Sequence, residues 1–228
     1  GPEISEMMKR LGKESQFVEG LRVSDEETAE IAEMVLVGKI NKGLTGEINL
    51  RGGRAVGLSG RDGNLIRARK APAVQTANGP VDLGRVGEID QIDVTVIRDL
   101  AAAGYIPVIA PTGLAPDGGM LNLNADTVAG ALAAALSAEK VIFMTDQPGI
   151  LRDAKDPTSV MSVVLLSEID RLRETGVVSG GMLPKTEAIQ VAIEAGVPKI
   201  HVVDGRIPHA LILEIFSDRG IGTMVVKG

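Results

Sequence analysis

The sequence predicts an α/β fold in which a mostly parallel open sheet is sandwiched between helices, with β-hairpin insertions. Strand and helix patterns alternate through most of the chain, which is typical of a parallel sheet covered by helices. Two of the strand patterns, residues 106–111 and 141–146, are apolar, as in strands that are buried on both faces. With 228 residues, 44% of them hydrophobic, the chain can form one α/β domain built as two lobes.

The first part of the sequence predicts two helices joined by a short extended segment. Pro2 lies in the first turn of an amphipathic helix that Gly12 ends. After the extended segment at 21–23, Ser24 or Asp25 caps a long helix. The inner face of this long helix is expected to carry its apolar side chains, which are Ile31, Met34, Val35 and Leu36.

The middle of the chain predicts short strands and one helix. Residues 54–70 read as a strand, a glycine-rich turn and a second strand. The polar segment 73–85 is expected to be a loop or hairpin, and residues 86–89 a short strand. Asp93 then caps a helix that ends at Gly104.

Residues 120–140 are the stretch around which the rest of the chain is organised. A loop at 112–120 leads into it, and its second half is an uncharged run of Ala, Leu and Val that predicts a buried helix. Asn124 or Asp126 can cap this helix, but a cap needs only one such side chain. The segment offers four, so a ligand is expected there: Asn122, Asn124, Asp126 and Thr127.

The remaining third of the chain predicts alternating helices and strands. A loop at 147–159 is followed by a helix that Ser167 and Asp170 begin as a capping box. A longer helix has Pro184 in its first turn and ends at Gly196. The last three elements are a strand, a helix and a strand, at 199–205, 209–220 and 222–228.

The composition excludes several classes of protein. Cysteine is absent, which excludes disulfides, thiolate catalysis and cysteine-ligated zinc. The formal charge of -6 and the small number of aromatic residues, three Phe and one Tyr, argue against broad nucleic-acid binding. No apolar run is long enough to cross a bilayer, and no signal-peptide pattern opens the sequence, so a cytoplasmic protein is expected.

Polar groups fall at three predicted strand-to-helix turns: residues 122–126, Thr145 with Asp146, and residues 179–181 with Lys185. Such turns present backbone N–H groups and the positive end of a helix dipole to anions. A lysine at a helix start opposes that dipole. A bound phosphate and an ordinary solvated side chain explain Lys185 about equally well. From spacing alone, Arg22 is expected to be a surface arginine.

The sequence lacks the Walker, dinucleotide-binding and nucleophile-elbow motifs. Its two histidines, His201 and His209, have no acidic partner at the spacing of a metal site, so they are expected to be structural or regulatory. The kinds of catalysis that remain are substrate positioning and electrostatic stabilisation, which are typical of enzymes that transfer phosphoryl groups.

Six segments, in this order, resemble one known family: GLRVSD, AVGLSGRDG, LNLNAD, TDQPGIL, GGMLPK and HVVDGRIPHALILEIFSDRGIGT. They are similar to the N-acetyl-L-glutamate kinases of arginine biosynthesis, in the amino acid kinase superfamily. The resemblance implies the amino acid kinase fold, with an acetylglutamate-binding lobe at about 1–137 and a nucleotide-binding lobe at about 138–228. It also implies phosphorylation of the γ-carboxylate of N-acetylglutamate by ATP, with Mg²⁺ carried by the nucleotide rather than by a metal site of the protein.

The resemblance implies roles residue by residue. Arg22 matches the arginine that grips a substrate carboxylate, which replaces its reading as a surface residue, and Gly1 and Asn122 match other substrate-binding positions. Asp126 matches the aspartate that organises the catalytic lysines, and Lys185 the lysine that stabilises the transition state. The nucleotide-binding positions are Thr145, Asp146, Ser179, Gly180 and Gly181, and the positions of arginine regulation are His201, Glu214 and Gly220.

The chain departs from the family at its beginning. The family starts with a strand that carries a second lysine and a glycine turn, whereas this sequence opens on a helix. The expectation is therefore that the chain is either a fragment of a longer natural protein or inactive by itself. Arginine-inhibited members also carry an N-terminal helix that is missing here, although the C-terminal stretch resembles theirs. The expected partners are a second copy of the chain in a homodimer or hexamer, arginine as feedback inhibitor and a PII-type signalling protein.

Two alternatives differ from this enzyme in class or in substrate. The first is a non-catalytic amino-acid-binding sensor, which would have no reason to keep Asp126, Asp146, Lys185 and the glycine pair together. The second is a kinase that acts on a carrier-linked aminoadipate in lysine synthesis. The choice between substrates depends on the pocket around Arg22 and Asn122.

Overall fold

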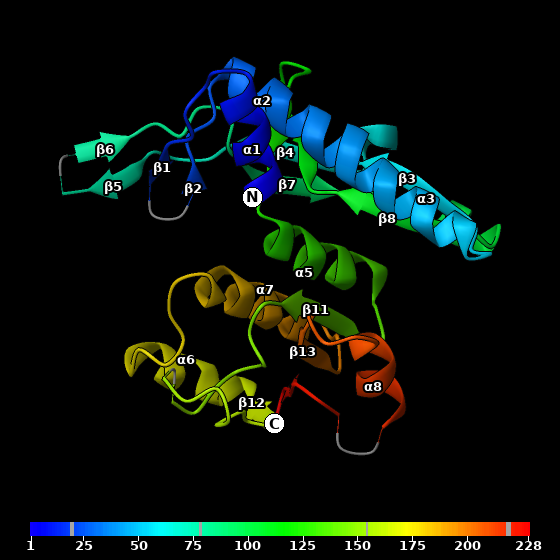
Figure 1. Cartoon of the computed structure of the whole chain (residues 1–228), viewed down its shortest axis with the longest axis vertical. Coiled ribbons are helices and arrows are strands. Elements are labelled where there is room, and N and C mark those ends of the chain that lie inside the picture. Colours follow the sequence, from blue (N-terminus) through cyan, green and yellow to red (C-terminus); the bar gives the residue numbers. More distant parts are fainter. Residues whose placement is uncertain (19–20, 78, 154, 218–219) are drawn as a thin grey trace. The chain divides into compact units, whose positions relative to one another are not determined.

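The computed structural model describes residues 1–18, 21–77, 79–153, 155–217 and 220–228. The chain divides into two compact units, Gly1–Ala125 and Asp126–Gly228, and each is described by itself (Figure 1). Within the described residues no helix is both long and apolar enough to cross a membrane.

Unit 1 begins with helix α1 (Pro2–Arg10), the strand pair β1 (Phe17–Val18) and β2 (Leu21–Arg22), and a long helical stretch. That stretch comprises α2 (Glu26–Glu33), the π-helix η1 (Met34–Asn41) and α3 (Lys42–Leu50), which follow one another in Figure 1. The capping prediction is confirmed for Asp25, whose carboxylate accepts a hydrogen bond from the backbone N–H of Thr28 at 2.8 Å.

The predicted inner face of the long helix is wrong at Met34. Ile31 and Val35 are buried and Leu36 is half-buried, but Met34 is 62% exposed. Consecutive residues of a helix point in different directions, whereas residues four apart share a face. Ile31 and Val35 therefore face the core together, and Met34 points into solvent.

The strands of unit 1 form small sheets. Strands β3 (Ala55–Ser59) and β8 (Ile106–Ala110) make a parallel pair. Strands β4 (Ile66–Lys70), β7 (Gly87–Ile92), β9 (Thr112–Leu114) and β10 (Met120–Asn122) form a sheet in the order β10-β9-β4-β7. A hairpin of β5 (Val74–Thr76) and β6 (Gly79–Val81) confirms the prediction for 73–85 and projects from the unit in Figure 1.

Several expectations for unit 1 need correction. The loop expected at 112–120 is largely the antiparallel hairpin β9–β10. The strand expected at 86–89 extends to Ile92. Strand β8 was expected to be covered on both faces, but Ile106 at its start is 47% exposed. Among the described residues, β3 is the single hydrogen-bonded strand neighbour of β8. Helix α4 (Thr95–Ala102) begins after Asp93, whose carboxylate accepts from the backbone N–H of Thr95.

Unit 2 contains helix α5 (Ala125–Leu136, whose first residue closes unit 1), strand β11 (Val141–Thr145), strand β12 (Val163–Leu165) and helix α6 (Leu166–Glu174). Helix α7 (Met182–Glu194), strand β13 (Ile200–Asp204), helix α8 (Ala210–Phe216) and strand β14 (Thr223–Val226) follow. The sheet order is β11-β13-β14-β12, with β11/β13 and β12/β14 parallel and β13/β14 antiparallel. The α/β prediction is confirmed, and the pairing is mixed.

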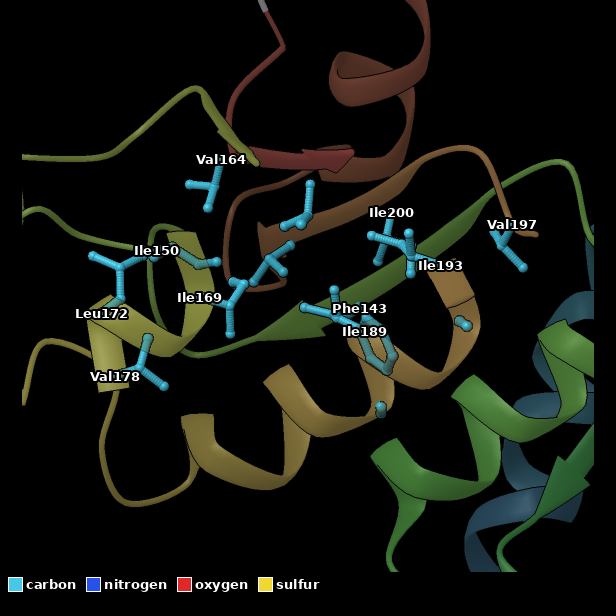
Figure 2. Packing of buried hydrophobic residues seen from close by; sticks show 14 of the residues in the cluster. Phe143, Ile150, Val164, Ile169, Leu172, Val178, Ile189, Ile193, Val197 and Ile200 are labelled. Carbon is cyan, nitrogen blue, oxygen red and sulfur yellow. The ribbon is translucent and has the colours of Figure 1, made fainter. Parts of the chain in front are cut away.

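The core of unit 2 lies between this sheet and two helices. Figure 2 shows Ile189 and Ile193 of α7 and Ile169 of α6 converging with Phe143 of β11 and Ile200 of β13. All five side chains are at most 4% exposed. Their burial fixes α7 against β11, and this contact sets the position of the polar residues at the start of α7.

Three expectations for unit 2 were wrong or incomplete. Strand β12 was missed, and α6 starts at Leu166 rather than at a Ser167–Asp170 capping box. Glu168 supplies the cap, because its carboxylate accepts from the backbone N–H of Leu165 at 2.8 Å. The apolar helix α5 is buried along one face only, at Val128, Gly130, Leu132 and Ala133.

Candidate functional site

The centre of the site is an ion pair between two helices of unit 2. Lys185 is the fourth residue of α7 and is only 6% exposed, and its Nζ donates to Oδ1 of Asp126 on α5 at 2.5 Å. The ammonium also lies 5.0 Å from the centre of the Phe143 ring. Because a helix start disfavours a cation, the carboxylate and the aromatic face are what stabilise the charge there.

A glycine allows the two helices to approach each other. Gly130 lies one turn after Asp126, and a Cβ placed on it would lie 2.6 Å from the carbonyl oxygen of Ala188. On α7, Ala188 lies three residues after Lys185 and on the same side of the helix. The backbone contact between Gly130 and Ala188 therefore holds Asp126 and Lys185 within hydrogen-bond distance.

A cavity of about 540 Å³ opens beside this ion pair. It lies at the carboxyl end of β11 and the N-terminal end of α7, where an open α/β sheet usually binds ligands. Apolar side chains such as Ile150, Leu151 and Val178 form part of its wall. The wall also contains six of the residues predicted from sequence: Asp126, Thr145, Asp146, Ser179, Gly181 and Lys185.

The polar groups of this cavity are largely uncommitted. Among the described residues, the hydroxyl of Thr145 makes only long contacts, at 3.4 Å, with the carboxylate of Asp146 and the backbone N–H of Gln147. The 179–181 turn precedes α7, and Gly180 adopts a φ of 53°, a conformation that favours glycine. Gly180 is the one predicted nucleotide-binding residue that does not line the cavity. A helix start following such a turn is suited to an anion.

In unit 1, the guanidinium of Arg22 is buried, so the expectation of a surface arginine is wrong. The residue is 6% exposed, and burial lowers the pKa of its guanidinium. Its four acceptors in the described part of the chain are the sulfur of Met8, the hydroxyls of Ser5 and Ser15 and the carbonyl of Gly1. All four are uncharged, so the positive charge is available to an anionic ligand.

Backbone hydrogen bonds link Arg22 to Asn122. Ser24, two residues after Arg22, donates its N–H to the carbonyl of Leu83 at 2.9 Å and accepts one from the N–H of Arg85. The carbonyl of Arg85 accepts from the N–H of Asn122 at 2.8 Å. Gly1 contacts Arg22 directly, at 3.1 Å. The three predicted substrate-binding residues are therefore brought into one region of unit 1.

The residues predicted for arginine regulation also lie together, in unit 2. Nδ1 of His201 is 2.5 Å from Oε1 of Glu214, and both residues are buried. Oε2 of Glu214 accepts from the backbone N–H groups of Ile221 and Gly222. Burial by itself would raise the pKa of Glu214, but the hydrogen bonds from Ile221, His201 and Gly222 outweigh it and leave the pKa lowered. Gly220, with a φ of 62°, packs against the same carboxylate.

Sequence reasoning missed the residues that support these groups. Ser5, Ser15 and Phe17 surround Arg22, and Gly130 and Phe143 support the ion pair of Lys185. Serine and glycine are too common to draw attention singly. Phe17 and Phe143 carried a usable signal, since the chain has only three phenylalanines.

Comparison with known proteins places the chain in a family. The model of the amino acid kinase family matches residues 1–204. The chain is 55% identical over 225 residues to an acetylglutamate kinase of Methanothrix thermoacetophila, covering 99% of this chain and 78% of that protein. It is 54% identical over 231 residues to an acetylglutamate kinase of Pelotomaculum thermopropionicum, covering 100% of this chain and 78% of that protein.

A solved structure supports the fold. N-acetylglutamate synthase from Neisseria gonorrhoeae, complexed with coenzyme A and N-acetyl-glutamate, matches with a TM-score of 0.83 and 23% identity. The match covers 100% of this chain and 50% of that chain. At this identity the match shows the fold alone, whereas the family is shown by the family model and the two acetylglutamate kinases. The chain therefore belongs to the amino acid kinase family, and within it to the acetylglutamate kinases.

Proposed function

We propose that this chain phosphorylates the γ-carboxylate of N-acetyl-L-glutamate with ATP, giving N-acetyl-L-glutamyl 5-phosphate in arginine biosynthesis. The supporting observation is the position of Lys185, which is paired with Asp126 in the wall of a cavity that Thr145, Asp146 and Ser179 also line. The names of relatives at 54% and 55% identity support the choice of substrate.

In this reaction an oxygen of the substrate carboxylate attacks the γ-phosphorus of ATP. The bond to the oxygen that bridges the β- and γ-phosphates breaks, and ADP leaves. The attacking carboxylate is already ionised near pH 7, so the step needs no general base. Negative charge spreads over the equatorial oxygens of the transferring group, and the protein contributes positioning and positive charge. Lys185 supplies that charge, while Asp126 holds its ammonium in place.

The proposed nucleotide-binding lobe, at about 138–228, lies within unit 2. The 179–181 turn and the start of α7 offer backbone N–H groups to the phosphates, and the apolar part of the cavity suits the base. The proposed acetylglutamate-binding lobe, at about 1–137, includes unit 1, in which Arg22 binds a carboxylate of the substrate and Asn122 supplies its half-buried amide.

Mg²⁺ is proposed to enter with the nucleotide. Across the described ranges, no group of three or more His, Cys, Asp or Glu side chains is arranged to hold a metal. Asp126 is engaged by Lys185, which leaves Asp146 as the carboxylate on the cavity wall that can approach the ion. One carboxylate and the phosphates fit the way Mg²⁺ is usually bound, and the ion supplies charge neutralisation.

The test is a coupled ADP-release assay on the protein expressed from its full reading frame, with trapping of the acyl phosphate by hydroxylamine. We expect ADP release that requires N-acetylglutamate and a hydroxamate formed in equal amount. Turnover only with a carrier-linked aminoadipate would support the lysine-pathway kinase, and ligand binding without ADP release would support a sensor.

Arginine is the proposed regulator, acting at the cluster of His201, Glu214 and Gly220. Glu214 already accepts from His201, so an arginine guanidinium would have to replace His201 at Oε1. Calorimetry with arginine tests this, and the absence of binding to the full-length oligomer would remove the proposal. Three further properties stay predictions from the family and the composition: assembly into a homodimer or hexamer, a PII-type partner and a cytoplasmic location.

A further inference from the structure

The guanidinium of Arg22 is held by two serines that come from different segments. Oγ of Ser15 accepts from Nη1 at 2.6 Å, and Oγ of Ser5 accepts from Nη2 at 3.0 Å. Ser5 lies on helix α1, and Ser15 lies in the connection between α1 and β1. The two contacts approach different nitrogens, so together they fix both the position and the plane of the group.

Ser15 is itself fixed on both sides. Its hydroxyl donates to the sulfur of Met8 at 3.3 Å. Before it, the backbone N–H of Lys13 donates to the carbonyl of Met8, and after it the carbonyl of Gln16 accepts from the N–H of Val23, next to Arg22. The Phe17 ring lies 4.6 Å from the guanidinium carbon of Arg22 and covers one face of the group. These contacts hold the Ser15 hydroxyl in place beside the guanidinium.

These contacts orient the cation without neutralising it. Two half-buried arginines of unit 1 differ from Arg22 because they form ion pairs with carboxylates. Arg61 pairs with Glu33, and Arg85 pairs with Glu26 and Asp117. Arg22 is more buried than either, yet its acceptors in the described part of the chain carry no charge. Within that same part, its Nε–H has no acceptor. A planar donor that is rigid and still fully charged is prepared for a carboxylate.

We propose that Ser15 and Ser5 are positioning residues that hold the guanidinium of Arg22 in the orientation needed to bind a carboxylate of the substrate. The proposal rests on the proposed function, since it takes N-acetylglutamate as the ligand. Neither serine touches the transferring phosphoryl group in this role. Loss of either hydroxyl therefore weakens substrate binding and leaves the chemical step almost unchanged.

The experiment compares Ser15→Ala, Ser15→Thr and Ser5→Ala with the unchanged protein, expressed from its full reading frame. Ser167→Ala is the matched control, because Ser167 is an exposed serine of α6 in the other unit. For each protein, kcat, both KM values, the Kd for N-acetylglutamate from calorimetry and the midpoint of thermal unfolding are measured. Ser15→Thr keeps the hydroxyl, so it separates the hydrogen bond from a general effect of substitution.

We expect Ser15→Ala to raise both KM and Kd for N-acetylglutamate about tenfold, the scale of one lost hydrogen bond to a charged group. Its kcat and its KM for ATP should stay within about twofold, and Ser15→Thr should recover most of the affinity. Ser5→Ala should give the same pattern with a smaller change, because its contact is longer. Ser5→Ala also tests the proposal if Ser15→Ala does not fold.

Unchanged affinity for N-acetylglutamate in folded Ser15→Ala and Ser5→Ala, beside normal turnover by the unchanged protein, would overturn the positioning role alone. Equal losses for N-acetylglutamate and ATP together with a lowered unfolding midpoint would also overturn it, in favour of a structural role. If the unchanged protein neither binds nor phosphorylates N-acetylglutamate, the proposed function itself fails.

Discussion

The ammonium of Lys185 on α7 lies 2.5 Å from the carboxylate of Asp126 on α5, although the two residues are 59 positions apart in the sequence. The pair is mostly buried, with side-chain exposures of 8% and 25%. A buried lysine whose ammonium is held by a carboxylate has little freedom to move, which is the preorganisation that electrostatic catalysis needs. Each member of the pair gives one prediction.

Lys185→Ala is expected to lower kcat by about a hundredfold or more, the scale of losing one preorganised charge donor. The contact is proposed to strengthen as charge develops on the phosphoryl oxygens, so both KM values should change much less. Steady-state kinetics measure this, with Lys140→Ala, an exposed lysine of the same unit, as control. An unchanged kcat in Lys185→Ala would contradict the assigned role.

Asp126→Asn is expected to reduce kcat by a comparable factor, because the ammonium loses the charge that holds it. It should also lower the free energy of unfolding by about 2–3 kcal/mol, less than for a fully buried pair because Asp126 is partly exposed. Kinetics and denaturant unfolding measure the two effects. If stability falls while kcat is preserved, the pair is structural rather than catalytic.

Much of the fold could be predicted from sequence. Hydrophobic periodicity identifies helices and strands from local residues, and glycine or proline often indicates where they begin or end. Strands 106–111 and 141–146 and the helix ending at Gly196 were found in this way. Strand β12 was missed because Val163–Leu165 runs directly into α6 with no turn residue between them. Met34 was misassigned because three consecutive apolar residues do not reveal which of them faces the core.

The candidate site also contains some residues that could be predicted from the sequence and others that could not. Residues such as Lys185 and Asp126 carry charge in unusual places, and a family resemblance supplied their proposed roles. The burial of Arg22 could not be read from spacing, since it results from contacts with Ser5, Met8 and Ser15 in segments whose packing is not encoded by a local pattern. Supporting residues of this kind emerge only when the tertiary structure is known.

Arg22→Ala is expected to raise KM for N-acetylglutamate far more than KM for ATP. A lost charge-assisted contact corresponds to about 2–3 kcal/mol. Arg22→Lys should recover little, because a lysine cannot reproduce the planar geometry that Ser5 and Ser15 hold. Arg67→Ala, an exposed arginine of β4, is the control. Equal effects on the two substrates would remove Arg22 from the substrate site.

Glu214 predicts a dependence of stability on pH. Its pKa is lowered in the folded chain from an ordinary value of 4.5, so its ionised form stabilises the fold. That contribution is complete above about pH 4.5 and is lost as the pH falls through the lowered pKa. Glu214→Gln should therefore unfold at a lower temperature than the unchanged protein at pH 7, with a difference that narrows below about pH 4. A difference that is constant from pH 7 to pH 3 would show that ionisation of Glu214 is not its cause.

Substitution of Gly130 and of Gly43 by alanine gives a matched pair of variants, which we expect to change the stability of the protein in opposite directions. Both are glycines within helices, in α5 and α3 respectively. A Cβ on Gly43 meets nothing within 4 Å, so Gly43→Ala should stabilise the protein by about 0.5–1 kcal/mol through helix propensity alone. A Cβ on Gly130 would lie 2.6 Å from the backbone oxygen of Ala188, which cannot rotate away as a side chain can.

Gly130→Ala must therefore push α5 away from α7, and the displacement acts on Asp126 and Lys185 one turn further along. We expect a lower unfolding midpoint and, in the folded fraction, a kcat reduced by about tenfold, because a displacement of about 1 Å can cost that much or more. Kinetics normalised to the folded fraction separate the two effects. If Gly130→Ala is as stable and as active as Gly43→Ala, close packing of the two helices is not what places Lys185.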